Sequence, residues 1–98
     1  MPGCTNVEGK VLLIQPELIL VMLRFQPHGT IHEHAADFDV DVICLEGEGY
    51  TSVDGQVATF KPGQMIRWPA LQRHRLWTDD SSMQTLMVEH RLQTAAPD

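Results

Sequence analysis

Hydrophobic residues occur in short runs or at every second position along this chain, and turn-forming residues separate these segments. The longest apolar segment, residues 18–25, lies between Pro16 and Pro27, and this favours a buried strand over a helix. The pattern is typical of an all-β protein, an antiparallel β-sandwich or barrel. It predicts about nine short strands and no helix, with the strands at residues 11–14, 18–25, 30–36, 38–44, 50–53, 56–60, 65–68, 72–78 and 83–89.

Turn signals connect these segments as hairpins. Asp54-Gly55 is the strongest, because this dipeptide suits the two-residue turn that matches strand twist. Lys61-Pro62-Gly63-Gln64 predicts a second turn, and Gly47 allows a turn or bulge. We therefore expect one domain over residues 1–98, with a barrel core at about 10–91 and polar tails at 1–9 and 92–98.

Composition narrows the classes of partner. The 13 acidic and 7 basic residues give a net charge of -6, which argues against a nucleic acid partner. The two cysteines, Cys4 and Cys44, do not form a disulfide framework and predict a reduced, cytoplasmic chain. No apolar run is long enough for a signal peptide or a membrane span, so no membrane partner is expected.

The histidines are the candidate metal ligands of this chain. Strand alternation predicts that Thr30, His32, His34 and Ala36 share one face of their segment. His32 and His34 would then lie about 6–7 Å apart, so they could chelate one ion together with a third ligand from a neighbouring strand. His28 and His90 are interpreted as surface or hydrogen-bonded residues.

Several of these features resemble the cupin superfamily, whose members are small jelly-roll barrels, also called double-stranded β-helices, that commonly hold a divalent metal. Gly63, Pro69 and His74 match the spacing of the second cupin motif, although Leu71 stands where that motif has a glycine. The segment 45–49 resembles the end of the first motif. The resemblance covers roughly residues 18–90 and implies that His74 joins the histidines of residues 32–34.

Two registers of the first motif are open. Without a gap, its first histidine is His34, while Ala36 and Val40 occupy the positions of the second histidine and the acid. With one extra residue between strands, His32 and His34 form the pair and Asp39 is the acid. Asp39 lies on the face opposite Val40 and would need a bulge to reach the interior. The preferred metal ligands are His32, His34 and His74.

The resemblance implies a divalent transition metal, Zn, Fe, Ni, Mn or Cu, in an apolar pocket that takes a small-molecule ligand. Oxygenation of the dioxygenase type or isomerisation would then act on a small oxygen-rich molecule, with no catalytic side chain assigned. The alternative is a non-catalytic binding or sensing cupin with a reduced or absent metal site. The apolar N-terminal strands also predict a homodimer, because exposed edges of that kind are usually covered. The expected pocket walls include Ala36, Val40, Val42, Met65 and Leu76.

Overall fold

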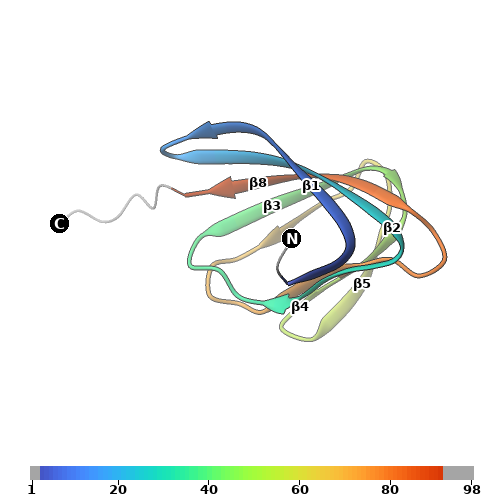
Figure 1. Ribbon diagram of the computed structural model, residues 1–98. Helices are drawn as coiled ribbons and strands as arrows, with labels where there is room; N and C mark the ends of the chain where they lie inside the picture. The colour runs from blue at the N-terminus through green and yellow to red at the C-terminus, as the bar shows by residue number, and fades with distance from the viewer. Residues whose placement is uncertain (1–2, 92–98) are drawn as a thin grey trace.

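The computed structural model describes residues 3–91, which form eight β-strands and no helix (Figure 1). The prediction of an all-β fold is confirmed. The strands are β1 (Cys4–Gln15), β2 (Leu18–His34), β3 (Asp39–Gly47), β4 (Gly49–Val53), β5 (Gln56–Phe60), β6 (Met65–Trp68), β7 (His74–Trp77) and β8 (Met83–His90).

Strand β2 holds the fold together. Its first half pairs with β8, from Leu18 to Phe25, and its last residues pair with β7, from Thr30 to His34. All pairings are antiparallel, and the strands follow the order β5-β4-β7-β2-β8-β3-β6, with β1 along β2. Because β2 belongs to both halves of the sheet, the sheet curls into an open barrel (Figure 1).

The N-terminal boundary of the barrel differs from the sequence prediction. Residues 4–9 were expected in a polar tail, but they belong to β1, where Cys4 pairs with Ile31 and Val7 with Phe25. The polar composition of this segment concealed the inward side chains of Cys4 and Val7, which pack against the core. The expected tail at 92–98 lies outside the described residues. The segments 18–25 and 30–36, expected as two strands, form the single strand β2.

The two turns expected from short motifs form as their residues require. Asp54 and Gly55 both have positive φ, 49° and 83°, as the primed hairpin turn between β4 and β5 demands. Gly63 has a φ of 86°, and the Gln64 N–H donates to the Lys61 carbonyl at 3.1 Å. This is the geometry of a type II turn with Pro62 and Gly63 at its centre.

The core lies between the two halves of the curled sheet. Its largest buried apolar side chains come from β2, β5, β6 and β7: Leu23, Phe25, Phe60, Trp68 and Leu76. Cys4 and Cys44 are free thiols. No helix in residues 3–91 is long and apolar enough to cross a membrane.

Candidate functional site

A cavity of about 340 Å³ opens at one end of the barrel, between the end of β2, the N-terminus of β1 and strand β3. Apolar side chains form most of its wall, and three histidines and two glutamates are its titratable polar residues. The lining residues are Gly3, Cys4, Leu23, Ile31, His32, Glu33, His34, Ala36, Phe38, Val40, Trp68, His74, Met87 and Glu89.

His34 and His74 meet in this cavity. They are paired across β2 and β7, and their Nε2 atoms lie 3.2 Å apart. The rings meet edge to face, with centroids 4.4 Å apart and an interplanar angle of 71°. Two residues 40 positions apart in sequence therefore direct their imidazole nitrogens at one point.

A hydrogen bond fixes the tautomer of His34. Its Nδ1 lies 2.9 Å from the His32 carbonyl oxygen, which can only accept, so this nitrogen carries the proton. In neutral His34 the lone pair is consequently on Nε2. The His74 Nε2 faces that lone pair, so the short contact requires either a proton or a cation between the two nitrogens.

His74 is held neutral by its surroundings. Its exposed fraction is 2%, and burial lowers its pKa to about 4, with the nearby His34 ring acting in the same direction. Its Nδ1 atom is buried and makes no hydrogen bond within residues 3–91. The nearby Gln72 backbone raises the pKa of His74, but this effect is smaller than that of burial. A neutral imidazole is the form that binds a metal ion.

Trp68 fixes the plane of the His74 ring. The two rings stack with centroids 4.1 Å apart and an interplanar angle of 7°. Trp68 is itself anchored, because its Nε1–H donates to Thr51 Oγ1 at 3.1 Å and the Thr51 hydroxyl donates to the Arg75 carbonyl at 3.0 Å. Trp68 is buried in the core and also lines the cavity.

His32 is directed elsewhere by a bulge. In the pairing of β2 with β7, Ile31 is opposite Leu76 and His34 is opposite His74. These pairs are three residues apart on β2 but two residues apart on β7, so β2 carries one extra residue, a β-bulge. The simple alternation expected for residues 30–36 is therefore broken, and Ile31 rather than Thr30 is buried. The His32 Nε2 lies 3.1 Å from Thr5 Oγ1, at the edge of the cavity.

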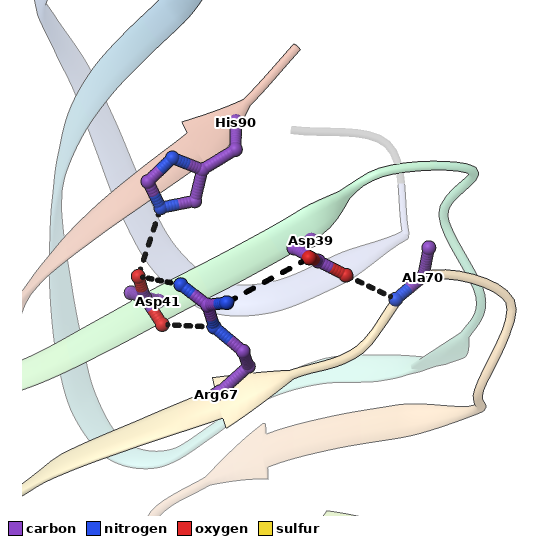
Figure 2. Close-up of polar contacts among 5 residues, drawn as sticks. All are labelled: Asp39, Asp41, Arg67, Ala70 and His90. Carbon is purple, nitrogen blue, oxygen red and sulfur yellow. Dashed lines mark hydrogen bonds and ion pairs between the residues drawn. The ribbon is translucent and has the colours of Figure 1, made fainter. Parts of the chain in front are cut away.

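The cavity wall matches the ungapped register of the first cupin motif. Ala36 and Val40 both line the cavity with His34 and His74. Asp39, the acid of the other register, does not line it; one of its carboxylate oxygens accepts the Ala70 N–H at 2.8 Å and the other lies 3.7 Å from Arg67 Nη1 (Figure 2). In the ungapped register, the positions of the second histidine and of the acid are apolar and line this cavity.

Other expected wall residues lie elsewhere. Met65 was expected in the pocket, but it is 63% exposed, because β6 turns Trp68 inward and Met65 outward. Val42 and Leu76 are buried in the core behind the cavity. The sequence reasoning missed Cys4 and Glu89 as lining residues. No local motif could reveal them, because they come from opposite ends of the chain.

The two histidines fit two positions of a metal site. Two imidazole nitrogens bound to one ion at about 2.0–2.1 Å with a tetrahedral angle lie about 3.3 Å apart, close to the separation of the two Nε2 atoms. Within residues 3–91, however, no group of three or more His, Cys, Asp or Glu side chains is arranged to hold a metal ion. His34 and His74 are brought together, and His32 is not part of the pair.

The curled antiparallel sheet around a histidine-lined apolar cavity defines a small jelly-roll barrel. A profile of the family described as Cupin domain matches residues 21–89. The chain therefore belongs to the cupin family. No curated protein matches it significantly.

Solved structures share this fold at low sequence identity. A cupin-like protein from Thermotoga maritima is 17% identical over 95% of this chain and 75% of its own, with a TM-score of 0.86. The polyketide cyclase RemF from Streptomyces resistomycificus is 19% identical over 96% and 71%, with a TM-score of 0.84. A cupin 2 conserved barrel domain protein from Leptotrichia buccalis is 26% identical over 86% of this chain and 40% of its own, with a TM-score of 0.81.

Proposed function

We propose that this cupin binds a small oxygen-bearing organic molecule in its cavity, next to a divalent transition metal held by His34 and His74. The observation that supports this most directly is the 3.2 Å approach of their Nε2 atoms. His32 is the proposed third ligand, after its imidazole leaves Thr5, because it already lines the cavity edge. A bound Zn, Fe, Ni, Mn or Cu ion would supply Lewis acidity, and a redox-active one would allow reaction with O₂.

The residues of the chain would prepare this site in three ways. The His32 carbonyl holds the proton on His34 Nδ1 and leaves Nε2 free to bind. Trp68 keeps the His74 ring in one plane. The apolar walls exclude water from the ligand, which strengthens polar interactions at the histidines.

The charges around the cavity favour a neutral ligand. Glu33 and Glu89 are the carboxylates of the wall, and both are paired, Glu33 with Arg73 at 3.4 Å and Glu89 with Arg91 at 2.7 Å. A ligand therefore meets compensated charges at the wall and two imidazoles inside. A compact, largely apolar molecule with one or two oxygens, such as an enol or a diol, suits this arrangement, and both isomerisation and oxygenation of the dioxygenase type act on such molecules.

A second candidate is a non-catalytic binding cupin with a reduced metal site. Ala36 and Val40 favour it, because they place methyl groups where the family motif has a histidine and a carboxylate. A missing carboxylate removes both a negative charge for the metal and a group for proton transfer. The same cavity would then hold its ligand by apolar contact and by hydrogen bonds to the imidazoles.

Metal analysis separates the two candidates. Protein purified without chelator and then reloaded with Zn, Ni, Fe, Mn or Cu should hold close to one equivalent. His34→Ala and His74→Ala should each lose it, and His28→Ala, a 70% exposed histidine paired with Asp80, should keep it. His32→Ala tests the third ligand: full occupancy in this variant would limit the protein ligands to His34 and His74.

Less than about a tenth of an equivalent in the wild-type protein after reloading would refute the metal proposal. The loaded protein should then be tested for O₂ uptake with catechols, flavonols and β-diketones. A metal-loaded protein that binds these compounds without turnover would support the binding candidate over the enzyme.

A further inference from the structure

One carboxylate of the cavity wall comes from the last strand of the barrel. Along β8, Met83 and Thr85 are buried in the core, and Glu89 follows them in the same alternation. Glu89 lines the cavity, and its side chain is only 16% exposed. It pairs directly with Val40 of β3, and residues paired in this way share one face of a sheet. The cavity therefore has a carboxylate beside Val40, contributed by β8.

Arg91 binds this carboxylate through one oxygen only. Its Nε–H donates to Glu89 Oε1 at 2.8 Å, and its Nη2 lies 2.7 Å from the same oxygen. The guanidinium is itself held in place, because its Cζ lies 4.3 Å from the centre of the Phe38 ring, and Phe38 also lines the cavity. No donor in residues 3–91 contacts Glu89 Oε2. This second oxygen is therefore an acceptor that is available to a ligand.

The ion pair determines which kind of donor suits Glu89 Oε2. Arg91 already balances the charge of the carboxylate, so a ligand ammonium would bring an uncompensated positive charge into an apolar cavity. An anionic ligand would be repelled by the carboxylate. A neutral hydroxyl group adds no charge, and its hydrogen bond to a carboxylate is stronger than one between neutral groups. The wall therefore favours a neutral ligand that donates a hydrogen bond.

The cavity is small enough for one molecule to reach both the histidines and Glu89. Its volume of about 340 Å³ corresponds to a sphere roughly 9 Å across. His34 and His74 belong to β2 and β7, whereas Glu89 belongs to β8, so the polar groups enter from different strands. Most of the remaining wall is apolar. A compact ring or chain with an oxygen at each of two positions fits this arrangement.

We propose that Glu89 Oε2 accepts a hydrogen bond from a hydroxyl group of the ligand and so restricts the cavity to neutral, hydroxyl-bearing molecules. Glu89 is then a specificity-determining residue. An ether of the same shape binds more weakly, because it leaves this oxygen without a donor. The inference rests on the proposed function in one respect, that the cavity takes a small oxygen-bearing molecule, and it does not depend on the metal.

NMR titration of the full-length protein with catechol and with 1,2-dimethoxybenzene tests this role, with a chelator present to exclude metal. The two compounds share a ring and two oxygens, but only catechol can donate a hydrogen bond. The wild-type protein should bind catechol about tenfold or more tighter. Glu89→Gln can present an amide N–H in place of the acceptor oxygen and should lower this preference about tenfold.

Glu33→Gln is the matched control, because Glu33 is the other carboxylate of the wall. Its side chain is 41% exposed and pairs with Arg73, and this variant should keep the wild-type preference. Glu89→Asp is a second test variant: it keeps the charge, withdraws the oxygens by one methylene and should lower the preference about threefold or more. Circular dichroism confirms that each variant is folded before its binding is interpreted.

Equal affinity of the wild-type protein for both compounds would overturn the inference, as would an unchanged preference in both Glu89 variants. An equal fall in Glu33→Gln and Glu89→Gln would assign the effect to the overall charge of the wall and would also overturn it. In these cases the cavity still binds a small molecule, so the proposed function stands. If neither compound binds the wild-type protein at about 10 mM, the proposed function fails and this inference fails with it.

Discussion

The Nε2 atoms of His34 and His74 lie 3.2 Å apart, although 40 residues separate the two histidines in the sequence. Their approach depends on the bulge in β2, which turns His34 toward His74 while Ile31 stays in the core. The same bulge directs His32 to Thr5. One irregularity in one strand thus selects which two histidines meet in the cavity.

Restoring the second histidine of the motif should strengthen metal binding. Ala36 lines the cavity with His34 and His74, so Ala36→His adds a third imidazole there. We expect at least about tenfold tighter binding of Zn²⁺ or Ni²⁺, because a third nitrogen ligand completes a chelate. Competition with a chromophoric chelator measures this. Ala35→His, one residue away at an exposed position, is the control, and an equal gain in both variants would contradict the geometry.

Metal-free protein should lose stability as the pH falls from about 6.5 to about 4. The pKa of His74 is lowered from 6.5 to about 4 in the fold. As the pH falls, this histidine is therefore protonated in the unfolded chain before it is protonated in the folded one, and this stabilises the unfolded state relative to the fold. The free energy of unfolding should fall by up to about 3 kcal/mol over this range. Urea unfolding at several pH values measures it, with a chelator present.

His74→Phe is the matched variant for this pH dependence. It keeps a ring on Trp68 and removes the titrating group, so its free energy of unfolding should vary less between these pH values. An unchanged slope would show that another group is responsible.

Neutralising Asp41 should destabilise the fold. Asp41→Asn leaves Arg67 and His90 without their shared carboxylate, and we expect a loss of about 1–2 kcal/mol at pH 7. The hydrogen bonds from Arg67, chiefly, lower the pKa of Asp41 to about 2. The contribution of ionised Asp41 to the free energy of unfolding is therefore complete above its ordinary pKa of 3.8 and is lost as the pH falls toward 2. Asp41→Asn has no carboxyl group at this position and should not show that loss.

Chemical unfolding monitored by tryptophan fluorescence measures the effect of Asp41→Asn. Asp80→Asn serves as the control, because the Asp80 side chain is 97% exposed, and its stability should stay within about 0.5 kcal/mol of the wild type. A similar loss in both variants would argue against a specific role for the Asp41 cluster.

Glycine at position 71 should stabilise the turn that leads to His74. Leu71 has a φ of 70°, a left-handed conformation that is costly for a side chain with a Cβ, and it is 77% exposed. Leu71→Gly should raise the free energy of unfolding by about 0.5–1 kcal/mol. Leu71→Ala keeps the Cβ and should not gain, so a gain in the alanine variant would assign the effect to loss of the exposed side chain instead.

The sequence did not predict this turn, and Leu71 was noted only as a residue in the place of the motif glycine. It predicted the hairpins at Asp54-Gly55 and Pro62-Gly63 directly, because positive φ is a local property of those residues. It failed at the N-terminus, where β1 begins at Cys4, because a partly polar strand is stabilised by pairing with β2 and has little signal of its own.

The sequence by itself determined the all-β class and the main turns, which follow from alternation and turn residues that act over a few positions. The approach of His74 to His34 was implied only by the resemblance to the cupin motifs. Only the tertiary structure decided that His32 contacts Thr5 and that Trp68 supports His74. The reason is physical: a bulge shifts every following side chain to the other face, and its position is set by packing between strands distant in sequence.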